Sequence, residues 1–203
     1  MNFALYKTKK QKMKTFKMKL IKREYSLILL SLVFASTSCN TSQEKSEEAG
    51  VPKMSIHEAA FMGNVKELKA HIQAKSDLNQ KDSYGSAPLS IAALFGKSEI
   101  AKLLIEAGAD VNVRSGDGST PLHSAAFFCR TEIVKMLLDK GADISLRNNY
   151  GSTALESVSG PFSDVKPIYD QFSKDLGPLG FKLDYAYVEA SRPEIAKMIL
   201  SAK

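Results

Sequence analysis

Two kinds of short helical pattern alternate along the middle of the chain. The first begins at a proline and contains a pair of alanines, as at Pro88 and again at Pro121. Paired alanines allow a helix to lie close to its neighbours. The second pattern has apolar residues three or four positions apart, which places them on one helical face. It occurs at Ile100, Leu103 and Leu104, and again at Ile133, Val134, Leu137 and Leu138. The sequence therefore predicts pairs of helices, a closely packed inner one and an amphipathic outer one.

These helix pairs recur with a period of 33 residues. Gly85, Gly118 and Gly151 are separated by this interval, and so are three equivalent leucines. A single helix pair cannot bury its apolar face, so the repeats are expected to stack on one another. The predicted repeats lie at about 55–81, 82–114, 115–147 and 148–203.

Capping residues predict where the helices begin and end. Thr120 precedes Pro121, so its side chain can cap free amides of the first turn, where proline loses no hydrogen bond. Gly108 and Gly141 follow the outer helices and predict left-handed caps. Asp and Asn then build the connecting turns. The aspartates predicted to cap backbone amides there, rather than bind calcium, are Asp82, Asp110 and Asp143.

The residues that carry the period resemble ankyrin repeats. Residues 120–126 and 132–143, which contain Thr-Pro-Leu-His and Gly-Ala-Asp, match that family's pattern closely. The resemblance implies an all-α ankyrin-repeat solenoid of about four helix-turn-helix units with short β-hairpin turns. It also implies a structural hydrogen-bonding role for His123. The first repeat departs from the pattern, with Lys69 and His71 at apolar positions, and is predicted to cap the stack.

The fourth repeat is interrupted between its two helices. Residues 192–200 parallel residues 130–138 but arrive about 29 residues later than the period requires. Ser191 and Glu194 have capping-box spacing, so the outer helix is predicted to restart there. The helical insert, at about 161–190, is expected to be either a packed extra helix or a partner-binding element. Its apolar residues at helical spacing are Val165, Ile168, Tyr169, Phe172 and Leu176.

The positive charge of the chain is concentrated at its start. The formal net charge is +6, of which residues 1–38 carry +8 and the remainder −2. Because the remainder is nearly neutral, the charge does not indicate a nucleic-acid partner. Residues 1–38 resemble a signal peptide, with lysines before an apolar run too short to span a bilayer. Met13 and Met18 are alternatives to Met1 as the true start.

Small residues lead into Cys39, as in the processing site of bacterial lipoproteins. The resemblance implies lipidation of Cys39 and a membrane anchor. Ser36 stands where an aliphatic residue is usual, so cleavage nearby and release of a soluble protein is the alternative. Residues 39–53 are polar and predict a flexible tether, followed by the ankyrin-repeat domain at 54–203. With Cys39 lipidated, Cys129 has no disulfide partner and is predicted to be a buried apolar side chain.

We find no catalytic constellation in the sequence. The three histidines, His57, His71 and His123, suggest no shared metal shell, and the glycine-rich residues 116–119 lack the ending of a phosphate loop. We therefore expect no enzymatic activity, no cofactor and no bound metal. A weaker alternative places an active site among acidic residues of the insert, namely Asp164, Asp170, Asp175 and Asp184.

The surface expected to bind a partner is the concave one. In ankyrin proteins, contacts usually come from turn tips and from two variable residues after the alanine pair. The predicted partner-binding residues are Phe61, Met62, Leu94, Phe95, Phe127 and Phe128 on inner helices, and Tyr84, Asp117, Asn149 and Tyr150 at the tips. A continuous apolar strip of this kind is typical of protein-binding sites. Two alternatives stay open: the second residue of each pair packs between repeats, or the insert or tether covers the strip.

Together these features predict a non-enzymatic protein-binding module. It would be exported and tethered in the bacterial cell envelope, facing the periplasm or outer membrane, with a partner protein of unknown identity. One alternative is a structural envelope protein that associates with itself, and another is a secreted ankyrin effector acting on host proteins. Ankyrin repeats are a scaffold, so the partner is not encoded in the fold.

Overall fold

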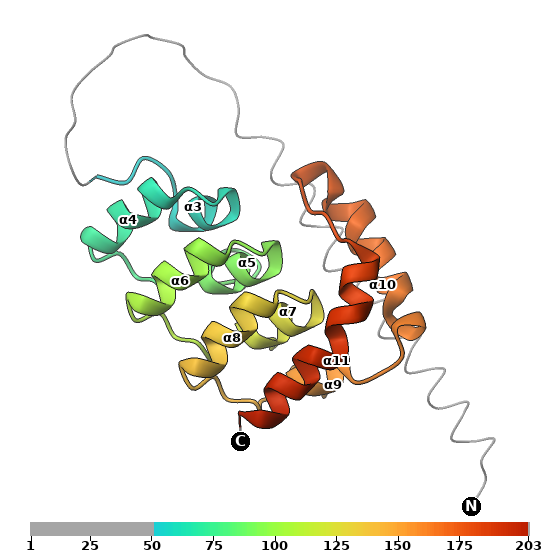
Figure 1. Cartoon of the computed structure of the whole chain (residues 1–203). Helices are drawn as coiled ribbons and strands as arrows, with labels where there is room; N and C mark the ends of the chain where they lie inside the picture. Colours follow the sequence, from blue (N-terminus) through green and yellow to red (C-terminus); the bar gives the residue numbers. More distant parts are fainter. Residues whose placement is uncertain (1–50, 203) are drawn as a thin grey trace, which may run out of the picture. The chain divides into compact units, whose positions relative to one another are not determined.

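The computed structural model describes residues 51–202. The predicted signal peptide at 1–38, the lipidation site Cys39 and most of the predicted tether lie outside these residues. Residues 51–164 and 183–202 belong to one compact unit, the repeat stack, and residues 165–182 belong to another. The regular elements of the described residues are all helical, as predicted (Figure 1).

The repeat stack consists of two rows of helices (Figure 1). Each inner helix packs against the next inner helix, and each outer helix against the next outer helix. The inner row is α3 (Ile56–Met62), α5 (Pro88–Phe95), α7 (Pro121–Phe127) and α9 (Ala154–Val158), and the outer row is α4 (Val65–Gln73), α6 (Ser98–Glu106), α8 (Thr131–Asp139) and α11 (Tyr185–Ser201).

Fully buried alanines and leucines hold the rows together. Ala92 and Ala93 in α5 have no exposed surface, and neither do the equivalent pairs in α3 and α7. Leu89 of α5 and Ile133 of α8 are likewise buried. Because the alanine side chain is small, the buried pairs allow adjacent inner helices to pack closely.

The helix ends follow the predicted capping signals. Thr153 accepts a hydrogen bond from the backbone N–H of Glu156, whose carboxylate accepts one from the Thr153 N–H. Gly108 and Gly141 have φ angles of +90° and +76°, the left-handed conformation expected after α6 and α8. Lys75 takes the same position after α4 with a φ of +53°. The first repeat therefore keeps the backbone geometry of the others without their glycine.

The turns between repeats are closed by hydrogen bonds rather than by β-strands. Asp82 Oδ1 accepts from the backbone N–H groups of Tyr84 and Ser86, as predicted for a capping aspartate. Hairpin-type backbone bonds occur at each turn, but no segment of residues 51–202 is a strand. Side-chain amides also join successive repeats, since Asn79 Oδ1 accepts from the Asp110 N–H at 2.8 Å. The equivalent bond from Asp143 to Asn112 is the same length.

The outer helix of the fourth repeat begins earlier than predicted. Helix α11 starts at Tyr185, where Asp184 accepts from the N–H groups of Ala186 and Tyr187. The predicted start at Ser191 and Glu194 is wrong, because the helix runs through Pro193. The fixed φ of proline is close to the helical value, so α11 can continue through Pro193, at the loss of one backbone hydrogen bond.

Contacts within the stack fix the first half of α11. Cys129 Sγ lies 3.4 Å from the backbone oxygen of Val188, to which it donates a hydrogen bond. The hydroxyl groups of Thr131 and Tyr187 are 3.1 Å apart. Arg192 is only 3% exposed and donates to the backbone oxygen of Gly160 at 3.0 Å. These bonds tie α11 both to α8 and to the loop after α9.

The insert is helical where its pattern predicted a helix. It contains α10 (Phe162–Leu176) and a 3-10 helix at Gly177–Leu179, ended by Gly180 in the left-handed conformation. Tyr169, Phe172 and Leu176 are buried, and the rings of Phe172 and Phe181 lie 6.4 Å apart. An exposed ion pair joins Lys166 to Asp170 one turn later.

Candidate protein-binding surface

Apolar side chains from three successive inner helices form the candidate surface. We call Phe61, Met62, Leu94, Phe95 and Phe127 the inner-helix strip. Met62 is 60% exposed, and the other four side chains are half-buried. Phe61 of α3 and Phe95 of α5 touch edge to face, with ring centroids 4.8 Å apart. The strip is therefore a preorganised row of rings that spans neighbouring repeats.

Phe128 does not belong to the exposed part of this strip. Its side chain is 4% exposed and packs edge-on against Phe127, at a centroid distance of 5.0 Å. Helix α7 ends at Phe127, one position earlier than α3 and α5 do, so Phe128 occupies the C-cap instead of the helical row. The prediction that Phe128 presents a partner-binding side chain is corrected here, and Met62 shows that burial of the second residue is not general.

The turn tips place polar groups beside one another in consecutive repeats. Tyr84, Asp117 and Tyr150 occupy equivalent positions and are all half-buried, whereas Asn149 is exposed. The Asn149 N–H donates to the backbone oxygen of Asp117 at 2.9 Å, and its side chain donates to Gly116. The tips of the third and fourth repeats are thus joined into one surface.

Asp117 is occupied by its own turn. One carboxylate oxygen accepts from the Ser119 N–H at 3.0 Å, and the other accepts from the Ser119 hydroxyl at 2.9 Å. Much of its hydrogen-bonding capacity therefore shapes the tip. Whether Asp117 also contacts a partner stays a prediction, as it does for Tyr84, Asn149 and Tyr150.

The histidines serve structural roles. His123 Nδ1 accepts from the Thr120 N–H, and Nε2 donates to the backbone oxygen of Ser152 in the next repeat at 3.0 Å. Burial lowers the pKa of His123 below its ordinary value of 6.5. The predicted structural role of His123 is confirmed. His71 is also buried, with Met54 O and Ser76 Oγ within hydrogen-bond distance of its ring nitrogens.

In the sequence, His71 is recognisable only as a departure from the repeat pattern. Its two bonds reach 17 residues back and five residues forward along the chain, so the ring closes the first repeat where an apolar side chain would otherwise stand. The only signal in the sequence for this structural role is a polar residue at a position where the repeat pattern expects an apolar one. The hydrogen-bond partners, Met54 and Ser76, are identified by the structure.

Cys129 is the buried side chain that the sequence predicted. It is 1% exposed, and burial raises the pKa of its thiol to about 11. A protonated, inaccessible thiol is a poor nucleophile. Among residues 51–202, no three His, Cys, Asp or Glu side chains are grouped so that they could hold a metal ion. No helix in the same range is both long and apolar enough to cross a membrane.

The family comparison matches the region that forms the strip. Residues 56–155 match the family model of ankyrin repeats, in three copies. These residues are similar to ankyrin repeats in sequence, and they form the stacked helix pairs of the inner and outer rows. They imply a module for protein–protein interaction, and ankyrin-repeat domains are typically non-enzymatic. None of the curated proteins compared with the chain matches it.

Proposed function

We propose that the chain is an ankyrin adaptor of the bacterial cell envelope that binds a partner protein through the inner-helix strip and the adjoining turn tips. The observation that carries this proposal is the strip itself. It combines an exposed Met62 with four half-buried apolar side chains, three of them phenylalanines. Phenylalanine and methionine are enriched in the cores of protein interfaces, and a few central residues contribute most of the binding free energy.

The hydrogen-bonded tips support a partner that is a folded protein surface. Tyr84 and Tyr150 lie on either side of Asp117 in the repeat order, and Asn149 is fixed to the preceding tip. Aromatic and polar groups held in place lose little conformational entropy when a partner binds. The strip would supply the apolar centre of the interface, and the tips would supply its polar rim.

The sequence supports an anchor for this module. Lipid on Cys39 would hold the repeats at a membrane through the polar residues 39–53. The partner would then be an envelope or periplasmic protein that the module positions, stabilises or inhibits. The alternative is that the protein is secreted without a lipid anchor and acts on host proteins.

Photocrosslinking in intact cells tests the working surface. A photoreactive amino acid is placed at Met62 or Tyr150, and at Lys102 on the exposed side of α6 as the control. We expect a discrete heavier adduct from Met62 and Tyr150 but not from Lys102. Adducts only to residues 161–190 of the same chain would show that the strip is covered internally. Adducts only to a second copy would favour self-association through the strip.

A single substitution then measures the contribution of the strip. Because Met62 is 60% exposed, Met62→Asp should leave the melting temperature within about 2 °C of the wild type. It should weaken binding to the crosslinked partner at least about tenfold, since a carboxylate would be desolvated in the interface. Lys102→Asp is the matched control. Unchanged binding by Met62→Asp would remove the strip from the interface.

The anchor has its own test. Cys39→Ser should abolish incorporation of a labelled fatty acid and move the protein from the membrane fraction to the soluble fraction. If wild type and variant fractionate identically, the lipoprotein assignment is wrong. Wild-type protein in the culture medium would instead support the secreted alternative.

A further inference from the structure

The outward side of α11 carries apolar positions that are less buried than the equivalent positions of α8. Residues of α11 correspond to residues of α8 that lie 62 positions earlier in the chain. At one such position Val134 is buried and Ala196 is half-buried; at another, Leu138 is half-buried and Leu200 is 49% exposed. In the stack, each outer helix packs against the next one. Within the described part of the stack, α11 is the last helix of the outer row.

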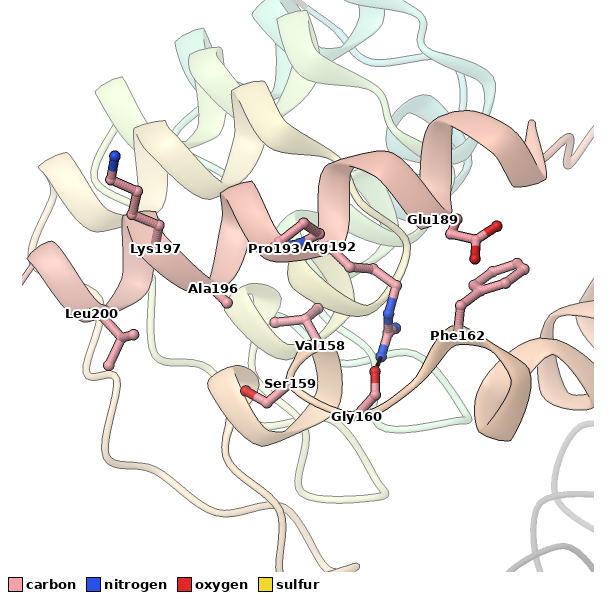
Figure 2. A pocket seen from close by; sticks show the side chains of 10 residues that line it. All are labelled: Val158, Ser159, Gly160, Phe162, Glu189, Arg192, Pro193, Ala196, Lys197 and Leu200. Carbon is pink, nitrogen blue, oxygen red and sulfur yellow. Dashed lines mark hydrogen bonds between the residues drawn. The ribbon is translucent and has the colours of Figure 1, made fainter.

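A cleft runs along this side of α11 (Figure 2). Its volume is about 510 Å³, and all its walls belong to the repeat stack. One wall is α11, and the other is formed by residues 158–160 and Phe162. Figure 2 shows Glu189 beside Phe162 at one end of the cleft and Leu200 at the opposite end. The cleft is long and open, as a helix-binding groove is.

The side chains along α11 have the spacing of a helix that pairs with another helix. Ala186, Glu189, Pro193, Ala196 and Leu200 are separated alternately by three and four residues. All of them are exposed except Ala196, which is half-buried. Another side of α11 packs into the stack, and its buried side chains include Val188, Ile195 and Ile199. The buried Arg192 lies between the two sides and lines the cleft.

The charges on this side are arranged symmetrically about Pro193. If two copies of α11 pair antiparallel with a two-fold axis at Pro193, each residue faces the one equally far beyond Pro193 in the second copy. Glu189 then faces Lys197, and the small Ala186 faces Leu200. Glu189 and Lys197 are exposed, and neither forms an ion pair within residues 51–202. Both charges are therefore available to a second copy.

We infer that this face binds a second copy of the chain, forming a symmetric dimer in which the two α11 helices pair antiparallel across Pro193. Leu200 of each copy lies at the Phe162 end of the other copy's cleft. Lys197 of each copy pairs with Glu189 of the other, so the pairing has a fixed register. The surface is separate from the inner-helix strip, and the inference does not depend on the proposed function.

Cysteine crosslinking of the full chain locates the axis. The chain is purified in mild detergent with Cys39→Ser, which leaves only the buried Cys129 as a native thiol. A cysteine at the two-fold axis lies opposite itself, so Pro193→Cys should form a covalent dimer under mild oxidation. Lys135→Cys, on the exposed side of α8, is the control and should stay monomeric. Equal crosslinking of the two variants would overturn the inference.

Charge reversal tests the register independently. Glu189→Lys places like charges opposite each other at both symmetric positions, and so does Lys197→Glu. Each variant alone should dimerise about tenfold more weakly than wild type in sedimentation experiments. When the two variants are mixed, both positions regain opposite charges, so a mixed dimer should form at least as well as the wild type.

The mixing experiment separates a true interface from damage to the fold, because two misfolded chains would not rescue each other. Failure of the mixture to dimerise would overturn the proposed register. A wild-type chain that stays monomeric at about 50 μM would overturn the dimer itself. Neither result bears on crosslinking from Met62.

Discussion

The third and fourth repeats both pack an inner helix against an outer helix, but the segments that join the two helices differ greatly in length. In the third, α7 and α8 are separated by three residues, Phe128, Cys129 and Arg130. In the fourth, α9 and α11 are separated by α10 and the 3-10 helix. Even so, Ile195 and Ile199 of α11 are as deeply buried as Ile133 and Leu137, which they replace in register.

This difference separates what the stack requires from what it tolerates. It requires the outer helix to present buried side chains at fixed positions against α8 and α9. It tolerates a long detour between inner and outer helix, because the detour joins two points that the stack already fixes. Asp184 adds an N-terminal cap, and Pro193 stands where α8 has its first residue, Thr131.

The largest effect is expected from two substitutions that create cavities at equivalent positions of α8 and α11. Ile133→Ala and Ile195→Ala each remove a side chain that has no exposed surface. Each should lower the free energy of unfolding by about 2–5 kcal/mol, through lost burial and the cavity left behind. Urea denaturation of the full chain measures both. A loss below about 1 kcal/mol for Ile195→Ala alone would show that α11 is packed less firmly than α8.

A smaller effect is expected where the two outer helices differ. Pro193 lies inside α11, so its missing N–H leaves the Glu189 carbonyl without a helical partner. Pro193→Ala should raise the free energy of unfolding by about 1–3 kcal/mol, provided that the helix is continuous. Thermal unfolding monitored by circular dichroism checks it. Destabilisation would mean that the proline stands at a true helix start, as in the register of α8.

The smallest effect is a difference in pH dependence between the two inner helices. His123 and Glu156 occupy equivalent positions after their capping threonines. Burial lowers the pKa of His123 from 6.5, so the unfolded chain binds a proton more tightly there, and stability falls as the pH drops below about 6.5. Hydrogen bonds from the Thr153 N–H and from Arg147 lower the pKa of Glu156 from 4.5, so its contribution is lost only below about 4.5.

Two variants assign these pH ranges. His123→Gln should flatten the melting temperature between pH 7 and 5, while leaving the loss below pH 4.5 in place. Glu156→Gln should do the reverse, because the amide oxygen can still accept from the Thr153 N–H but does not titrate in this range. If His123→Gln kept the full slope between pH 7 and 5, another group would be responsible for it.

Local signals in the sequence were sufficient to predict most of the stack. Glycines at a 33-residue interval, prolines at helix starts and paired alanines each act within a few residues of where they stand, so they can be interpreted without the fold. The helical spacing of Tyr169, Phe172 and Leu176 likewise predicted α10. The start of α11 was missed because a proline is compatible both with a first turn and with a helix that continues through it.

The candidate surface was harder to predict, because exposure depends on where each helix stops. Phe95 and Phe128 are 33 residues apart and chemically identical, yet one ends a helix while the other is a buried C-cap. The roles of His71 and Arg192 depend on backbone oxygens distant in sequence, at Met54 and Gly160. Because every residue has a backbone carbonyl, no sequence pattern identifies which carbonyl will accept a hydrogen bond from such a side chain.

The return of α11 to register after the insert makes the loop between α9 and α11 a permissive site for engineering. The entropy of closing a flexible loop grows only logarithmically with its length, so extending a few residues to about 30 costs roughly 2 kcal/mol. Two contacts hold α11 in place whatever the length of the segment between: Cys129 donates to Val188 of α11, and Arg192 of α11 donates to Gly160 just after α9. A fluorescent reporter or an affinity tag placed there would leave the inner-helix strip in its native sequence.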